Sequence, residues 1–370
     1  MLKKLLCGLS FAILSACAVS PDKPMALKRE SFSSLPGWRE DSFEEAFPAL
    51  KRSCEKPQKL WEDFCSGLAR LEGRSPKEIR RYLEQELTPY QVYSYGRKEG
   101  TFTGYYEASL KGSFKKEGNY SVPIYGIPSD FVMLNTQEVC QPGGDKGILY
   151  GRLKDGKFTS PYLTRSQINE TEMAAPVLLW VDSSVDAFIL HIQGSGRVET
   201  PEGVIHLGYA GNNGHPFLGI GSIMKAEGLL ESGKSSMPYI REWLKENPKK
   251  AEQLMAQNPR YIFFRILPKS DGPLGSAGVS LTPERSLAVD TAYIPLNTPI
   301  FLNTKTPDGD KIQKLVVAQD TGSAIKGAIR GDFFWGFGEN AFQMAGRMKS
   351  EGEYFLLWPK GQPLPTEGQK

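Results

Sequence analysis

The chain has 370 residues, and its 45 basic and 42 acidic side chains leave a formal charge of only +3, which excludes the strongly basic surface typical of nucleic-acid-binding proteins. Three histidines, with no CxxC or HExxH motif, argue against a zinc site, and no metal or cofactor is expected. This length and an ordinary composition predict two globular domains, each large enough to bury a core.

The first 17 residues, MLKKLLCGLSFAILSAC, predict a bacterial lipoprotein signal peptide. Two lysines precede an apolar run, Leu5–Leu14, that is too short to remain as a membrane span. The run ends in Leu-Ser-Ala-Cys, which fits a lipobox, so Cys17 is expected to become the acylated first residue and to hold the protein at the membrane. An ordinary cleaved secretion signal is the alternative.

The residues after Cys17 predict the compartment and a linker. Ala18, rather than an aspartate, follows the cysteine, and by resemblance to bacterial sorting patterns this favours the outer membrane, facing the periplasm. No later stretch is apolar and long enough to predict a transmembrane helix. Residues 18–35, with scattered prolines and serines, predict a tether between the lipid and the folded body.

Cysteine usage fits this location. With Cys7 removed and Cys17 acylated, three cysteines remain, and the periplasm permits disulfides. Cys54 and Cys65 flank a predicted helical turn-back, so we predict a bridge between them. Cys140 is then expected to be a small buried residue.

The first folded segment is predicted to be helical. In SPKEIRRYLEQEL, Ser75 is a candidate N-cap, Pro76 occupies the first helical position and Glu78 completes a capping box. Four apolar side chains then recur at helical spacing and are expected in the core, namely Ile79, Tyr82, Leu83 and Leu87.

After Pro89 the pattern changes to short segments rich in β-formers and separated by Gly, Pro and Asn. These segments predict strands over 102–110, 120–128, 176–182, 186–193, 260–267, 298–304, 314–320 and 353–359. Between them, residues 236–259 predict a helix that is broken near Pro248. The sequence therefore predicts one β-rich domain inserted into another.

The segment Gly228–Ser235, GLLESGKS, satisfies the P-loop pattern, but a phosphate loop needs a buried strand before it. The preceding residues, IGSIMKAEGLL, have helical rather than strand-like spacing. We therefore interpret Gly228 and Gly233 as helix-end and turn residues, against the nucleotide-binding alternative.

Two Gly-rich motifs offer groups for a polar ligand. HIQGSGR ends the predicted strand 186–193, and its glycines permit a sharp turn beside Gln193 and Ser195; a simple Gly-rich hairpin is the alternative. In GYAGNNGHP, Asn212, Asn213 and His215 offer the two-sided hydrogen bonding that carbohydrates need, and His215 is assigned to binding at most.

A third motif, FTGYY, places Tyr105 and Tyr106 on opposite faces of a predicted strand. One ring can belong to the core while the other stacks on a sugar ring; the alternative is that both rings are core.

The stretch QDTGSAIKGAIRGDFFWGFG places two aspartates, Asp320 and Asp332, around a Gly- and cation-rich loop. A buried carboxylate costs free energy unless it is paired or hydrogen-bonded, and the aromatic residues 333–335 predict some burial of Asp332. The simpler interpretation is that both residues cap turns. The functional interpretation is an acid in a sugar-binding groove.

In their order behind a lipobox, FTGYY, HIQGSGR, GYAGNNGHP, NPRYIFF and VVAQDTGSAIKGAIRGDFFWGFG resemble the MltA family of membrane-bound lytic murein transglycosylases over roughly residues 100–358. The resemblance implies a mainly β fold with helices (α+β), in which a double-psi β-barrel domain carries an inserted second β-domain. The barrel domain would comprise residues 36–107 and 265–370, and the insert residues 108–264, with a glycan groove between them.

The resemblance also implies roles for particular residues. The three aspartates of the family fall on Asp290, Asp320 and Asp332, with Asp332 as the catalytic acid and the other two as supporting acids. The candidate glycan contacts are Thr103, Tyr105, Gln193, Ser195, Asn212, Arg265 and Lys326.

The implied reaction breaks the MurNAc-β-1,4-GlcNAc bond of peptidoglycan strands without water, because the muramyl C6 hydroxyl closes onto C1 as a 1,6-anhydro product. The substrate supplies its own nucleophile, so one carboxyl group suffices where most glycosidases use two. Two alternative hypotheses for the function are a non-catalytic peptidoglycan-binding lipoprotein and a hydrolase with a second carboxylate near Asp332. Partners among cell-wall synthases are not indicated by the sequence.

Overall fold

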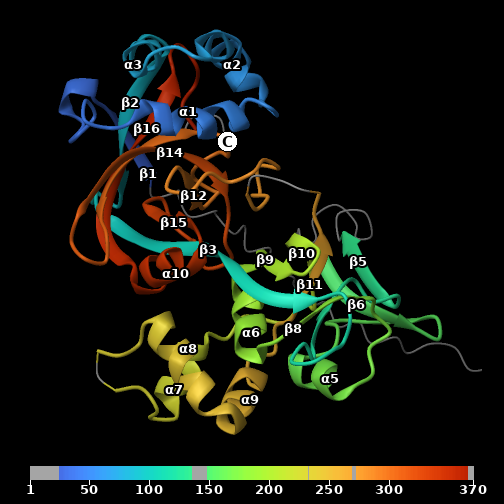
Figure 1. Ribbon diagram of the computed structural model, residues 1–370. Helices are drawn as coiled ribbons and strands as arrows, with labels where there is room; N and C mark the ends of the chain where they lie inside the picture. The colour runs from blue at the N-terminus through green and yellow to red at the C-terminus, as the bar shows by residue number, and fades with distance from the viewer. Residues whose placement is uncertain (1–24, 136–147, 232, 269–271, 366–370) are drawn as a thin grey trace, which may run out of the picture.

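The computed structural model describes residues 25–135, 148–231, 233–268 and 272–365 as an α+β molecule with a β-barrel, a helical cap and a second lobe (Figure 1). The predicted signal peptide, Cys17 and Cys140 lie outside the described residues. Within those ranges, no helix is both long and apolar enough to cross a membrane.

The barrel forms because one chain of strand pairings closes on itself. Its strands pair in the order β16 (Lys349–Pro359), β13 (Pro299–Lys305), β14 (Lys311–Asp320), β12 (Ser286–Val289), β15 (Arg330–Phe337) and β3 (Gly100–Ser113). β3 then pairs with β16 again. The β12–β14 and β15–β3 pairs are parallel and the others are antiparallel. This closed sheet is consistent with the expected double-psi β-barrel.

Continuous apolar runs form the barrel strands because both faces of these strands are buried. Ile300, Val316 and Leu356 belong to the cluster inside the barrel. Their neighbours in sequence, such as Phe301 and Leu315, point outward into the cluster under the helical cap. The alternation of side chains along each strand thus serves two cores at once.

The helical cap covers the outer face of β14 and its neighbours (Figure 1). It contains α1 (Phe43–Ser53), α2 (Glu62–Leu68), α3 (Pro76–Glu86) and the 3-10 turns Phe32–Ser34, Lys59–Trp61 and Ala69–Leu71. The predicted capping box of α3 is confirmed, with Ser75 accepting from the Glu78 amide while the Glu78 carboxylate accepts from Ser75. A disulfide joins Cys54 to Cys65, the predicted pair, with 5.3 Å between their Cα atoms.

The predicted tether, residues 18–35, is wrong in its second half. Met25–Arg29 forms β1, which pairs with β2 (Leu87–Ser94), and β2 in turn pairs with β16. Met25 and Leu27 pack against the barrel-interior cluster, so this segment has apolar surface to bury and joins the sheet as its edge strand.

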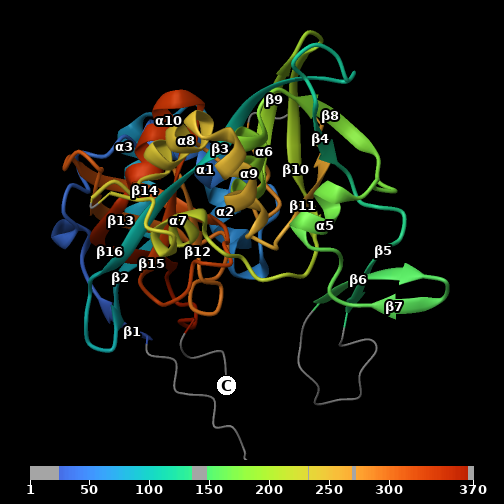
Figure 2. The same ribbon diagram turned by 90° about the horizontal axis from the view of Figure 1, so that it is seen from below.

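The second lobe contains a mixed sheet, a small separate sheet and several helices (Figure 2). The mixed sheet adds β9 (Gly196–Thr200), β10 (Gly203–Asn212), β11 (Ile262–Ile266), β8 (Val177–Val181) and β4 (Val122–Tyr125) to β3. The small sheet, which lies away from the barrel in Figure 2, comprises β5 (Phe131–Asn135), β6 (Ile148–Lys154) and β7 (Lys157–Thr159). The helices are α5 (Arg165–Glu170), α6 (Ser184–Gln193), α7 (Ile220–Ala226), α8 (Met237–Glu246) and α9 (Pro248–Ala256).

One long strand connects the barrel to the second lobe. The first half of β3 pairs with β15 and β16, and its second half pairs with β9 and β8. The domain boundary expected between residues 107 and 108 therefore falls inside a continuous strand. Side chains on β3 consequently serve the barrel at one end and the second lobe at the other.

The strand predicted over 186–193 is wrong, because these residues form most of α6. Ser183 caps the helix by accepting from the Asp186 amide, and Gly194 ends it in the left-handed region, with φ of 78°. The run was mistaken for a strand because its apolar residues, including Phe188 and Leu190, are buried all round the helix.

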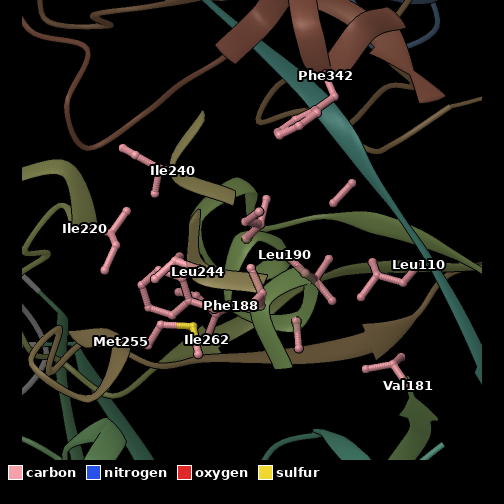
Figure 3. Close-up of a cluster of buried hydrophobic side chains, with 14 of the residues drawn as sticks. Leu110, Val181, Phe188, Leu190, Ile220, Ile240, Leu244, Met255, Ile262 and Phe342 are labelled. Carbon is pink, nitrogen blue, oxygen red and sulfur yellow. The ribbon is translucent and has the colours of Figure 1, made fainter. Parts of the chain in front are cut away.

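Figure 3 shows the core that surrounds α6. Phe188 and Leu190 share this core with Leu244 of α8 and Met255 of α9. Phe342 reaches the same core from α10 (Gly338–Arg347), which packs on β3 and β15. The two lobes thus share apolar packing beside the junction strand β3.

Candidate functional site

A cleft of about 590 Å³ lies between the barrel and the second lobe. Both parts contribute polar side chains to its walls. The barrel side includes Tyr105, Ala288, Ser276, Asp320 and Asp332, and the second lobe contributes Gln193, Ser195, Tyr209, Arg260 and Arg265.

The floor of the cleft is formed where β14, β12 and β15 run side by side. Ala288 on β12 is paired with Asp320 on one side and with Asp332 on the other. Because adjacent strands lie about 4.8 Å apart, the two aspartates are roughly 10 Å apart at Cα. Ala288, between the two aspartates, also lines the cleft.

Asp332 has the geometry of an acid that faces the cleft. It is partly buried, and its Oδ1 accepts a hydrogen bond of 2.6 Å from the Thr103 hydroxyl. Its Oδ2 has no hydrogen-bond partner among the described residues. Burial raises the pKa of Asp332 to about 6; the Thr103 hydrogen bond and the charge of Arg330 oppose this rise, and the charge of Asp320 adds to it.

The sequence predicts that all three aromatic residues after Asp332 bury it, but only one of them lies on its face of the strand. Phe333 and Trp335 contact each other on the opposite face of β15, with ring centroids 5.0 Å apart. Phe334 shares the face of the acid and packs on Tyr105, at 5.1 Å. The apolar wall beside Asp332 is therefore built by one ring from β15 and one from β3.

Asp320 is held by the loop that passes over the end of β14. Its Oδ1 accepts from the Ser276 amide at 3.0 Å and from the Ser276 hydroxyl at 2.8 Å. Burial raises the pKa of Asp320, and hydrogen bonds from the backbone of Thr321 and from Ser276 oppose that rise. The nearby Tyr105 hydroxyl is buried without a well-formed partner among the described residues, and its pKa is raised by burial and by the two aspartates.

Asp290 does not line the cleft. It is buried, and its carboxylate accepts from the Ala292 amide at 3.1 Å and from the Gly327 amide at 2.8 Å. These bonds tie the turn after β12 to the loop that leads into Asp332. The supporting role expected for Asp290 in catalysis stays a prediction.

The opposite wall comes from the end of α6. Because Gly194 ends the helix, Gln193 and Ser195 are presented to the cleft, and the Gln193 Oε1 accepts from the Tyr106 amide at 3.4 Å. Arg265, exposed on β11, completes this wall.

Three predicted glycan contacts lie outside the cleft lining. Asn212 is 4 % exposed and donates to the Tyr209 hydroxyl at 2.6 Å, so it supports a cleft residue instead of reaching the cleft itself. Lys326 is exposed on the loop beyond the lining residues. Thr103 contacts Asp332, and its own hydroxyl accepts from Arg330 at 2.8 Å.

Several lining residues were missed by the sequence reasoning. Ser276 lies in a loop with no pattern that points to Asp320, and Phe217 and Arg260 reach the cleft only through the fold. His191 was placed on a strand; on α6 it accepts from the Ile262 amide at 3.1 Å, and burial holds its pKa well below the usual value. Neutral His191 is therefore part of the wall.

In the segment that matches the P-loop pattern, the two glycines have structural roles, as predicted. Gly228 follows α7 with φ of 68° and Gly233 has φ of 80°, so both occupy left-handed positions, after a helix and in a turn.

Comparisons with known proteins give a consistent result. Residues 101–265 match the model of the MltA specific insert domain, and residues 285–358 match the 3D domain. The membrane-bound lytic murein transglycosylase A of Vibrio cholerae is 26% identical over 398 residues, covering all of both chains. The crystal structure of MltA from Neisseria gonorrhoeae, in its monoclinic form, is 35% identical with a TM-score of 0.82, covering 92% of this chain and 94% of that one.

A further solved structure agrees. The lytic transglycosylase LtgG of Burkholderia pseudomallei is 36% identical with a TM-score of 0.64, covering 90% of this chain and 96% of that one. These matches extend over both the barrel and the second lobe, and the chain therefore belongs to the MltA family.

Proposed function

We propose that this protein is a lytic transglycosylase that cleaves the MurNAc-β-1,4-GlcNAc bond of peptidoglycan without water and releases 1,6-anhydromuropeptides. The observation that carries the proposal is Asp332, a partly buried carboxyl group on the cleft floor whose pKa is about 6 and whose Oδ2 has no partner among the described residues. The relatives are named lytic murein transglycosylases, which supports the same reaction class.

In the first step, protonated Asp332 donates its proton to the glycosidic oxygen as the bond from that oxygen to the muramyl C1 breaks. With a pKa of about 6, roughly a tenth of the molecules carry this proton at pH 7. Proton transfer of this kind typically contributes about two to four orders of magnitude to the rate.

In the second step, the muramyl C6 oxygen forms a bond to C1, and the Asp332 carboxylate accepts the C6 hydroxyl proton. The acid is thereby regenerated, and no water is consumed. A second catalytic carboxylate is not needed, because the nucleophile belongs to the substrate. Asp320 tunes Asp332 through its charge, and Asp290 holds the loop before it.

The glycan strand would occupy the cleft with Asp332 below it and the second lobe above it. Gln193, Ser195, Tyr209 and Arg265 present amide, hydroxyl and guanidinium groups suited to sugar hydroxyls and carboxylates. We also propose that acylation of Cys17 anchors the protein at the outer membrane, as Ala18 after the cysteine favours, so that its cleft reaches the periplasmic sacculus.

The direct test compares wild type with Asp332→Asn on purified peptidoglycan sacculi, with products identified by mass spectrometry. Wild type is expected to release 1,6-anhydromuropeptides. Asp332→Asn is expected to release at least a hundredfold less, because an amide cannot donate and regain a proton, while it still accepts from Thr103 and still sediments with sacculi.

A matched control is Asp308→Asn, which removes an exposed carboxylate paired with Arg347 outside the cleft and is expected to keep full activity. Release of free reducing ends by wild type would indicate a hydrolase. Sedimentation with sacculi without any product would indicate a non-catalytic binding protein, and either result contradicts the proposal.

A further inference from the structure

A chain of two hydrogen bonds runs from Arg330 through Thr103 to Asp332. Arg330 Nη2 donates to Thr103 Oγ1 at 2.8 Å, and Thr103 Oγ1 donates to Asp332 Oδ1 at 2.6 Å. The chain follows from the parallel pairing of β15 with β3, which sets Asp332 beside Thr103 and Arg330 beside Thr101. Arg330 and Asp332 are two residues apart on one strand, so their side chains leave the same face.

The guanidinium itself is held in place by the backbone. Arg330 Nη1 donates to the carbonyl oxygens of Thr101 and Gly331. Arginine can only donate, so its contact with Thr103 uses the oxygen of the hydroxyl as an acceptor. Arg330 is not among the residues that line the cleft, and its hydrogen-bonded link to Asp332 runs through Thr103.

The positions of the protons follow from this arrangement. Thr103 has a single hydroxyl proton, and among the described residues Asp332 Oδ1 is the acceptor within its reach. With Arg330 occupying the other side of the hydroxyl, the Thr103 proton lies toward Oδ1. A proton on Oδ1 would then face the Thr103 proton, so the acid proton of Asp332 resides on Oδ2.

We propose that Arg330 is a positioning residue that acts through Thr103 to keep the acid proton of Asp332 on Oδ2, the carboxyl oxygen that is open to the cleft. This inference rests on the proposed function, since it assigns a particular oxygen to the proton donor of that reaction. Without the chain, the proton would divide between two oxygens, and half of the protonated molecules would carry it on the oxygen beside Thr103.

Other charged groups also face Asp332 and contribute to its titration. Asp320 approaches it from the end of β14, and the Tyr105 hydroxyl approaches from β3. Across the cleft, the lining includes Arg260 and Arg265 from the second lobe, together with neutral His191. The effect of Arg330 is separated from theirs by changing only Arg330 and Thr103.

The experiment measures the rate of anhydro-product release from peptidoglycan glycan strands between pH 4 and pH 9 for wild type, Arg330→Met, Thr103→Val and the double variant. Each single variant is expected to lower the limiting rate at low pH about twofold, because half of the protonated molecules would then carry the proton on Oδ1. Each is also expected to move the alkaline limb to higher pH, because the Thr103 hydrogen bond and the Arg330 charge both lower the pKa of Asp332.

The double variant distinguishes positioning from a general loss of structure. If Arg330 acts through Thr103, Arg330→Met causes no further loss in the limiting rate once Thr103 is Val. Arg347→Met, which breaks an exposed ion pair with Asp308, is the matched control and is expected to keep the wild-type profile. Thermal unfolding of every variant verifies that it is folded.

The possible failures can be told apart. A wild-type protein that releases no anhydro product contradicts the proposed function itself. An active wild type whose Arg330→Met variant keeps both the limiting rate and the alkaline limb overturns the role of Arg330 alone. The role of Arg330 is also overturned if the losses in limiting rate of the two single variants multiply in the double variant, because Arg330 and Thr103 would then act independently.

Discussion

Replacing Asp332 by Asn should stabilise the folded protein at neutral pH. The folded state raises the pKa of this carboxyl group, so ionisation costs more in the fold than in the unfolded chain. Asn is nearly isosteric and its amide oxygen can still accept from Thr103, so the variant removes the charge and keeps the packing.

The magnitude follows from the pKa difference. The pKa rises from the ordinary 3.8 to about 6, and a tenfold difference in proton affinity is worth 1.36 kcal/mol. Ionised Asp332 therefore costs the wild-type fold about 3 kcal/mol above pH 7. The stability associated with the neutral carboxyl is fully present below pH 3.8 and is lost as the pH rises through 6. At pH 4 the cost is only about half a kcal/mol.

Urea unfolding of wild type and Asp332→Asn at pH 4 and pH 7.5 measures the effect directly. The variant should gain about 2 kcal/mol more at pH 7.5 than at pH 4, and its midpoint should shift with no change in the slope m. Comparison between the two pH values cancels any contribution of the amide that does not depend on pH. An equal gain at both values, or a larger gain at pH 4, would refute the assignment of a raised pKa to Asp332.

Two more predictions concern the neighbours of the acid. Asp320→Asn removes a charge that raises the pKa of Asp332, so the alkaline limb of activity should move to lower pH; a limb that stays in place or moves up would exclude electrostatic tuning by Asp320. Gly104→Ala places a Cβ 2.6 Å from an indole nitrogen and 2.9 Å from a backbone atom of α10, so it should cost about 1–3 kcal/mol in thermal unfolding. Gly219→Ala, whose Cβ meets nothing closer than 3.7 Å, is its control, and equal effects of the two would contradict the packing argument.

The barrel strands could be predicted because their sequences combine continuous apolar runs with β-branched and aromatic residues. KLVVAQD and EYFLLWP became β14 and β16, where alternate side chains enter two different cores. Helix α3 could be predicted for a local reason, because Ser75, Pro76 and Glu78 specify its start without help from the rest of the fold.

The helix α6 shows where such patterns fail. Its sequence is apolar on every side, so periodicity cannot separate a buried helix from a buried strand. The decisive signals are Ser183 and Gly194, the caps on either side of the ten residues of the helix, whereas the prediction rested on the alternating apolar pattern between them. The edge strand β1 was not predicted for another reason: its partner β2 lies more than sixty residues away in the sequence.

Some cleft residues could likewise be predicted from the sequence and others could not. Asp332, Tyr105, Gln193 and Ser195 lie in motifs that could be recognised, and all four line the cleft. Ser276 could not be found from its own surroundings in the sequence, because its bond to Asp320 depends on a loop crossing the end of β14. Similarly, no local pattern distinguishes a polar residue that faces the cleft from one that supports it, such as Asn212.

The environment of Asp332 has to satisfy two opposite requirements in the proposed reaction. Burial alone would keep the carboxyl protonated and leave no base for the C6 hydroxyl. A hydrogen bond from Thr103 and the charge of Arg330 alone would keep it ionised and leave no acid for the glycosidic oxygen. The structure combines these effects with the opposing charge of Asp320, and the resulting pKa of about 6 makes both forms accessible near neutral pH. A single carboxyl group can then serve both steps, because its neighbours hold its pKa close to the pH at which it works.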